Sequence, residues 1–144
     1  MKKQLILGHL LPLIIGGFIY ISFRPDTLLM FKVFTALSVD LPIEYWRENT
    51  LGLKPLYPDW FLYSLPDGLW VFSYVSLVLC IWNNTISKYN VFWVFLMPIL
   101  AVLSEFGQYA RIVPGTFDAS DMVFYIFGTL LSVLIFTDIR QIKH

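Results

Sequence analysis

The chain has 144 residues, of which 58% are hydrophobic and only 14% charged, and its formal net charge at pH 7 is zero. A soluble domain carries roughly 25% charged residues because its surface must be wetted, so this composition excludes an ordinary water-soluble protein. The neutral charge balance also argues against a nucleic-acid partner. We predict an all-α, polytopic membrane protein in which residues 1–144 form one domain and the lipid bilayer is the solvent.

The first of four apolar runs covers residues 5–23 and contains no Asp, Glu, Lys or Arg. As a helix it would be about 28 Å long, close to the roughly 30 Å hydrocarbon core of a bilayer. Arg24 and Pro25 follow it, where a signal peptide would have a small-residue cleavage site. We therefore predict that this segment is a retained anchor helix.

The longest connection lies between Arg24 and Pro66. Its part from Thr27 to Val39 is apolar but too short to span, and we predict that it lies in the membrane interface, with re-entry into the bilayer left open. Asp40, followed by a proline and by Glu44, has the pattern of a helix start.

Three further apolar runs complete the four predicted spanning helices, at about residues 66–82, 91–110 and 119–138. Pro66 suits a helix start, because its missing N–H costs nothing there. Pro98 predicts a kink inside the third helix.

Four spans place both termini on one side of the membrane. The basic residues divide evenly between the two sides, but Lys2 and Lys3 directly precede the first helix, which usually dominates orientation. We therefore predict cytoplasmic N- and C-termini, with the connection between the third and fourth helices facing outward.

Polar side chains gather at the outer end of the predicted bundle. Glu105 and Gln108 share one face of the third helix, and a charged side chain in hydrocarbon costs roughly 2.5–3.5 kcal/mol on insertion scales unless it has a partner. Path counting places the candidate partners at the same membrane level. We predict that Glu105, Gln108 and Asp121 are catalytic candidates. The predicted substrate-binding candidates are Arg24, Asp67, Arg111 and Asp118.

Each candidate also has a purely structural interpretation. Asp118 could cap the fourth helix, and Asp67 could be a first-turn acid that the helix dipole favours. Glu105 and Arg111 could form a structural ion pair, and Arg24 could be a charge that snorkels to the interface. The sequence leaves these alternatives open.

Two chemistries suit such a cluster. Glu105 in a low-dielectric setting is suited to proton transfer as a general acid or base. An aspartate pair could instead bind a divalent cation that holds a phosphate, although we predict no metal or cofactor site of known spacing. No nucleophile is evident, because we expect no histidine base near Ser73 and judge His9 and His144 too isolated to form a site.

The third and fourth predicted helices resemble a known family. Glu105 and Gln108 form an E-x-x-Q pair, Pro114 and Gly115 follow as a turn, and Asp121 opens a helix that carries a glycine, Gly128, seven residues later. This pattern resembles that of the VanZ-like family of membrane proteins. The family is named for a protein linked to resistance to the glycopeptide antibiotic teicoplanin.

Three positions depart from the family pattern. Thr116 stands where the family has an arginine, Tyr125 where it has an asparagine, and no histidine follows Asp67 at the expected spacing; Arg111 is a candidate to replace the missing cation. The resemblance implies a multi-pass protein of the bacterial cytoplasmic membrane that acts near the cell envelope.

The favoured function is binding or processing of an envelope lipid, or of its head group, at the outward-facing polar cluster. The alternative is a non-catalytic accessory or structural subunit whose polar residues hold the helices together. A proton-coupled transporter ranks third, because four short helices enclose little pathway without oligomerisation. The sequence leaves open whether the protein is an enzyme.

Overall fold

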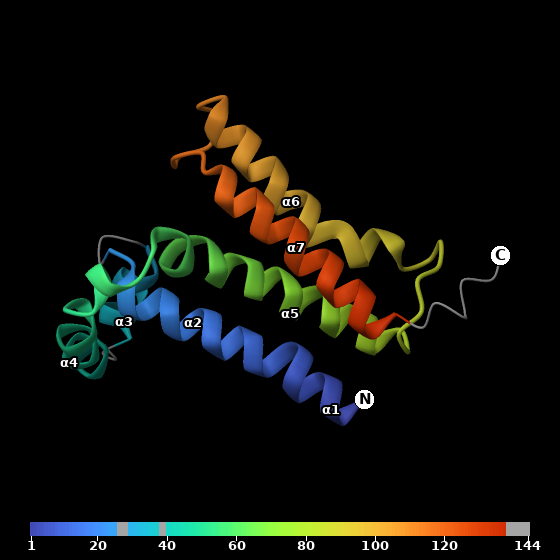
Figure 1. Ribbon diagram of the computed structural model, residues 1–144, viewed down its shortest axis with the longest axis horizontal. Coiled ribbons are helices and arrows are strands. Elements are labelled where there is room, and N and C mark those ends of the chain that lie inside the picture. Colours follow the sequence, from blue (N-terminus) through green and yellow to red (C-terminus); the bar gives the residue numbers. More distant parts are fainter. Residues whose placement is uncertain (26–28, 38–39, 138–144) are drawn as a thin grey trace.

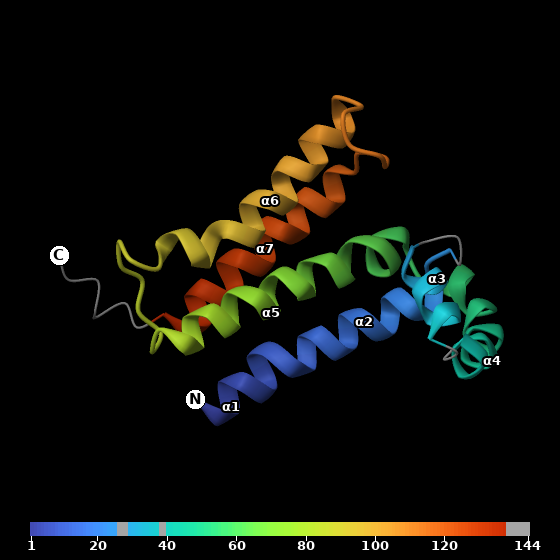
Figure 2. The same cartoon turned by 180° about the vertical axis from the view of Figure 1, so that it is seen from behind.

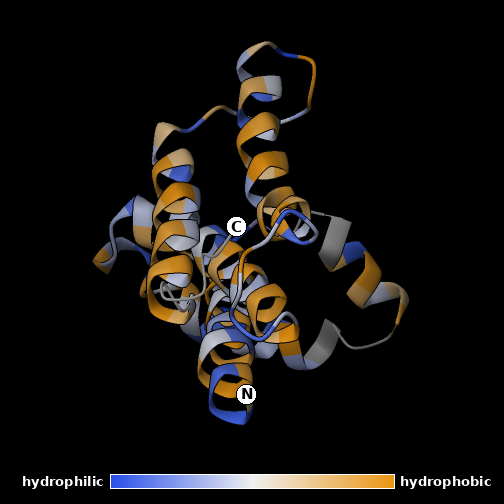
Figure 3. Cartoon of the chain, turned by 90° about the vertical axis from the view of Figure 1, so that its right-hand side faces the viewer, coloured by the Kyte–Doolittle hydropathy of each residue, from blue (hydrophilic) through white to orange (hydrophobic). Residues whose placement is uncertain are grey.

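The computed structural model describes residues 1–25, 29–37 and 40–137, and these residues form helices and connections without any β-strand. Four helices are long and apolar enough to cross a membrane, as predicted. Apolar residues cover most of their length (Figure 3). The chain is thus an all-α protein that fits a multi-pass membrane topology. The four helices are Lys2–Phe23, Trp60–Ile81, Val91–Tyr109 and Ala119–Phe136.

The first spanning helix is continuous but changes its winding. It comprises α1 (Lys2–Gln4), a wider π-helical stretch η1 (Leu5–Leu10) and α2 (Leu11–Phe23). The third and fourth spans are α6 (Val91–Tyr109) and α7 (Ala119–Phe136). Their bounds agree closely with the prediction, although α7 ends at Phe136, two residues before the predicted end at residue 138, because Thr137 is already extended.

The second span begins earlier than predicted. It consists of a π-helical stretch η3 (Trp60–Ser64) that runs directly into α5 (Leu65–Ile81). Pro66 lies at the start of α5, as expected, but the whole span begins earlier, at Trp60. The N–H of Leu65 bonds to the carbonyl of Trp60, and such wide turns accommodate the hydrogen bond that a proline cannot make. Asp67 thus lies in the first turn of α5 and about two turns inside the continuous span that begins at Trp60.

Helix α5 occupies the centre of the bundle, with α2 on one side and the α6–α7 pair on the other (Figure 1). Glycines allow the closest approach between α5 and α7. A Cβ atom added to Gly128 would collide with the backbone oxygen of Gly68. On the other side of α5, a Cβ at Gly16 would meet the indole of Trp70 at 2.7 Å. Small residues at a helix crossing let backbones pack closely in lipid.

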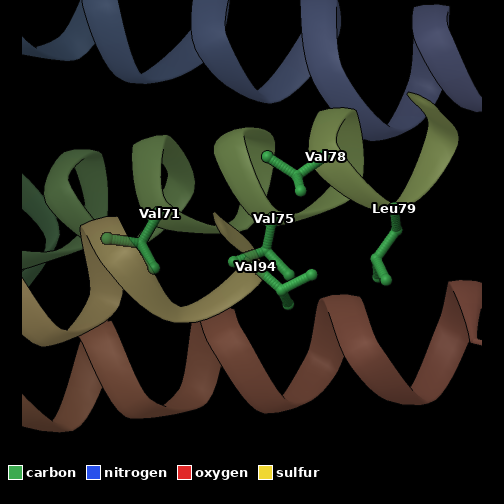
Figure 4. Close-up of a cluster of buried hydrophobic side chains, with 5 residues drawn as sticks. All are labelled: Val71, Val75, Val78, Leu79 and Val94. Carbon is green, nitrogen blue, oxygen red and sulfur yellow. The ribbon is translucent and has the colours of Figure 1, made fainter. Parts of the chain in front are cut away.

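The apolar core lies where α5 faces α6. Val71, Val75, Val78 and Leu79 project from α5, and Val94 of α6 packs against them (Figure 4). Val75, Leu79 and Val94 are completely inaccessible. Helix α6 continues through Pro98 and changes direction along its length (Figures 1 and 2), as the predicted kink requires.

Two short helices lie beyond the end of α2 (Figure 2). They are α3 (Leu29–Ala36) and α4 (Asp40–Leu51), followed by one 3₁₀ turn, η2 (Lys54–Leu56). The predicted helix start at Asp40 is confirmed. Trp46 of α4 donates to the Ser22 hydroxyl at 2.9 Å, and Arg47 donates to the carbonyl of Ile21 at 2.5 Å.

The interfacial position of this connection stays a prediction. The limits that we predicted for the interfacial segment, Thr27 and Val39, lie outside the described residues. The predicted cytoplasmic C-terminus does so as well.

Candidate functional site

A polar cavity of about 620 Å³ lies where the end of α2 faces the connection between α6 and α7. Spans one, two, three and four all contribute to it. Most of the lining side chains are polar or charged. The lining residues are Tyr20, Arg24, Pro25, Tyr63, Asp67, Glu105, Gln108, Pro114, Gly115, Thr116, Asp118, Asp121 and Tyr125.

The structure brings most of the predicted site residues together. Six of them line this cavity, and only Arg111 does not. The six are Arg24, Asp67, Glu105, Gln108, Asp118 and Asp121. They thus gather around one cavity, while their shared membrane level and their catalytic and substrate-binding roles stay predictions.

Arg24 and Asp67 form one wall of the cavity. The guanidinium Nη2 lies 3.3 Å from Asp67 Oδ2 and donates to the carbonyl of Tyr63 at 3.0 Å. The guanidinium also lies over the rings of Tyr20 and Tyr63, at 5.2 and 5.1 Å from their centroids. Both side chains of the pair are largely buried, at 23% and 17% exposed. Arg24 is thus a cation that is paired across two helices. This pairing favours a structural or binding role over simple snorkelling to the interface.

Glu105 closes the opposite wall. It is only 2% exposed. Its Oε2 accepts a hydrogen bond from the backbone N–H of Asp118 at 3.1 Å, and its Oε1 accepts one from the Gln108 amide at 3.4 Å. Both carboxylate oxygens of Glu105 are therefore occupied. The arrangement fixes the α6–α7 connection to the third helix, so Glu105 positions the cavity wall.

Arg111 ends α6 instead of facing the cluster. Its φ of 58° lies in the left-handed region, and its N–H bonds to the carbonyl of Gln108 at 3.0 Å. The N–H of Ile112 bonds to the carbonyl of Gly107 at 2.9 Å, so the last carbonyls of the helix are satisfied in a common C-terminal pattern. No ion pair joins Arg111 to Glu105 in the described ranges. The proposed structural pair between them is wrong, because the left-handed turn leads the chain away.

Asp118 and Asp121 stand at the N-terminus of α7. Asp118 Oδ1 accepts a hydrogen bond from the N–H of Ser120 at 2.8 Å, which confirms the N-cap interpretation of Asp118. Asp121 lies in the first turn. Its Oδ1 is buried and has no hydrogen-bond partner in the part of the chain that the structure describes. The buried Ser64 hydroxyl lies beside this carboxylate, and Asp121 also lines the cavity.

The turn between α6 and α7 depends on a glycine. Gly115 has a φ of 141°, a conformation that side chains rarely adopt, and a Cβ there would lie 2.7 Å from the side chain of Gln108. The Pro114–Gly115 turn thus folds directly onto the polar face of α6.

Three lining tyrosines, Tyr20, Tyr63 and Tyr125, were not predicted. A four-residue spacing from a predicted site residue could have found all three. Tyr63 precedes Asp67 by four residues, and Tyr125 follows Asp121 by four, so each lies one turn away on the same face. Tyr20 has the same spacing before Arg24. The tyrosines give the cavity aromatic as well as charged walls.

A largely apolar groove of about 170 Å³ adjoins the polar cavity between α5 and α6. Asp67 and Tyr125 line both spaces. The other groove residues are Trp70, Val71, Tyr74, Met97 and Ala101. The polar cavity and the apolar groove thus share one boundary.

A second polar contact corrects our expectation about Ser73. We expected no histidine near it, yet His9 Nδ1 lies 2.7 Å from Ser73 Oγ, and that hydroxyl donates to the His9 carbonyl at 3.0 Å. Ser73 is 1% exposed, so a substrate has no access to it, and the pair joins α5 to the π-helical stretch η1. The two residues are 64 positions apart in the chain. His144 lies outside the described residues.

Within residues 1–25, 29–37 and 40–137, no three His, Cys, Asp or Glu side chains lie close enough together to hold a metal ion. No protein-family model matches the chain, and no significant match is found among curated proteins or solved structures. The function therefore has to be argued from the cavity itself.

Proposed function

We propose that this membrane protein binds an amphiphilic lipid, with the lipid head group in the polar cavity and a hydrocarbon chain in the groove between α5 and α6. The observation that carries the proposal is the shared boundary. Asp67 and Tyr125 line both the polar cavity and the apolar groove. Ligand sites commonly combine an apolar lining with a few converging polar groups, and this pair of spaces matches the two halves of a lipid.

The walls of the cavity are preorganised for binding a head group. The Arg24–Asp67 pair and the bonds to Glu105 fix its two walls before any ligand arrives. Asp121 lines the cavity with no cation paired with it among the described residues, and Thr116 is an exposed lining residue. In this proposal Glu105 holds the wall, and Asp121 contacts the head group.

We further propose that the lipid belongs to a bacterial cell envelope and that the cavity opens to the outer side. The support is the sequence pattern of Glu105, Gln108, Pro114, Gly115 and Asp121, through which the chain resembles the VanZ-like family. Those residues all line the cavity. Proton transfer by Asp121 is the chemistry available in the cavity for processing a bound lipid.

A groove-filling substitution tests the proposal. Ala101 lines the groove and is half-buried, whereas Leu103, two residues further on the same helix, is 57% exposed. We expect Ala101→Trp to lower the amount of lipid that co-purifies with the protein, as measured by native mass spectrometry. Leu103→Trp, the matched control, is expected to leave that amount unchanged.

Equal lipid retention by both variants and the wild type would rule out the groove as a chain site. A non-catalytic structural module would then be the better description. That alternative has its own support, because the Arg24–Asp67 pair and the Glu105–Asp118 contact also serve to hold helices together.

A further inference from the structure

The charge of the polar cavity is unbalanced. Four carboxyl groups line it, from Asp67, Glu105, Asp118 and Asp121, against the single guanidinium of Arg24. Arg24 is already committed to Asp67, at 3.3 Å. A second cation, Lys54, lies 5.5 Å from the ring centroid of Tyr63 but does not line the cavity. The lining thus has acceptors that its own cation does not neutralise.

Two of the remaining carboxylates are satisfied by the chain itself. Glu105 accepts from the Asp118 N–H and from Gln108. Asp118 accepts from the Ser120 N–H, and its charge also lies at the positive end of the α7 dipole. Asp121 has the buried Ser64 hydroxyl beside it but no cation paired with it among the described residues. Three of the four carboxyl groups that line the cavity thus have no cation paired with them in the described ranges.

We propose that the lipid bound here carries a cationic ammonium head group. This inference rests on the proposed function and names its ligand class. An ammonium group supplies donors to Asp121 and Asp118, and charge-assisted hydrogen bonds of this kind are roughly twice as strong as neutral ones. The ring of Tyr125 lines the same cavity, and aromatic faces attract ammonium groups.

The same charge pattern disfavours a phosphate head group. A phosphate is bound by unpaired cations or by free N–H groups at a helix N-terminus. The cavity's only lining cation within the described ranges is held by Asp67, and Asp118 already caps the N-terminus of α7. Close to carboxylates and away from bulk water, like charges repel more strongly than they do in solution. The groove then receives the hydrocarbon chain below the ammonium group.

The test compares two amphiphiles with the same chain and opposite head groups. Wild-type protein in dodecyl maltoside micelles is mixed with dodecylammonium or with dodecyl phosphate at pH 7. The readout is the mole fraction of amphiphile that gives half of the maximal rise in unfolding temperature. We expect dodecylammonium to act at a mole fraction at least about tenfold lower than dodecyl phosphate, since a charge-assisted hydrogen bond contributes about 1.5–3 kcal/mol.

Substitutions of residues that line the cavity test whether the preference for dodecylammonium arises there. Asp121→Asn is nearly isosteric and is expected to reduce the preference for ammonium by about tenfold. Thr116 is an exposed lining residue, so Thr116→Lys should weaken ammonium binding and Thr116→Glu should strengthen it without affecting folding. Glu48→Gln removes an exposed acid of α4 outside the cavity and serves as the matched control.

The outcomes separate the two proposals. A preference for dodecyl phosphate that Ala101→Trp abolishes would overturn the ammonium inference and leave lipid binding intact. If neither amphiphile stabilises the protein, or if both act equally and independently of Ala101→Trp and Asp121→Asn, both proposals are overturned. A preference for ammonium that Thr116→Lys and Asp121→Asn do not change would place the ammonium site elsewhere and overturn the inference.

Discussion

The carboxylate of Glu105 accepts a hydrogen bond from the backbone N–H of Asp118 at 3.1 Å, and this bond fastens the start of α7 to the inner face of α6. We expect Glu105→Ala to lower the free energy of unfolding by about 1–3 kcal/mol, because a partly buried donor then lacks its acceptor. Glu105→Gln keeps an acceptor oxygen and should cost less. Unfolding in detergent measures both variants.

Hydrogen exchange gives the same prediction a local readout. The Asp118 amide should exchange faster in Glu105→Ala than in the wild type. Glu48→Ala, which removes an exposed glutamate of α4, should change neither quantity. Equal effects of Glu105→Ala and Glu48→Ala would show that the contact does not stabilise the fold.

The pair of Arg24 and Asp67 predicts a strong coupling between two helices. Removing one partner leaves the other charge largely buried, which typically costs about 3–5 kcal/mol, and we expect somewhat less here because both side chains keep some exposure. Replacing both residues by leucine should cost less than the sum of the single changes. A double-mutant cycle on unfolding in detergent measures the coupling, and additive single changes would contradict the pair.

The crossing of α5 and α7 makes Gly128 intolerant of a side chain. Any Cβ there meets the backbone oxygen of Gly68, so the helices must separate. We expect Gly128→Ala to destabilise the protein by more than about 1 kcal/mol, against the gain of up to about 1 kcal/mol that alanine brings to a helix. Thermal unfolding measures the difference.

Gly17 provides the matched control on the first spanning helix, because nothing lies within 4 Å of a Cβ built there. Gly17→Ala should be neutral or stabilising. A Gly128→Ala protein as stable as Gly17→Ala would mean that the close approach of α5 and α7 is absent.

Membrane orientation is tested by thiol labelling of intact cells. In a Cys80→Ala background, which removes the buried native thiol, single cysteines replace Thr116 in the α6–α7 connection or Lys88 in the α5–α6 connection. Both positions are exposed and lie at opposite ends of α6. An impermeant reagent is expected to label Thr116→Cys and not Lys88→Cys. The reverse pattern would show that the cavity opens to the cytoplasm.

The sequence was sufficient to predict the number of spanning helices and the gathering of charged side chains, because both depend on hydropathy and chain order. Glu105 needed a partner inside the membrane, and the chain path placed Asp118 and Asp121 near it. The nature of its partner was not predictable, since a backbone N–H carries no residue signature. Arg111 looked like the better partner by charge alone, and the left-handed turn at that residue removed it.

Two features depend on packing that the sequence does not encode locally. The early start of the second span arises from the wide turn before Pro66, which a standard helix pattern does not anticipate. The contact of His9 with Ser73 joins two separate helices. A hint was present on α5 and η3, where polar or amphipathic residues recur at every third position, namely Ser64, Asp67, Trp70, Ser73 and Ser76.

The donor that satisfies Glu105 is thirteen residues away, in the same hairpin. As the ribosome delivers the chain, α6 and α7 can therefore enter the bilayer together with this carboxylate already bonded. Arg24 arrives under different conditions, because its partner Asp67 is synthesised 43 residues later. Until then its long side chain can reach water at the bilayer edge. The two walls of the cavity thus mature at different stages of biosynthesis, one within a hairpin and one between segments that insert separately.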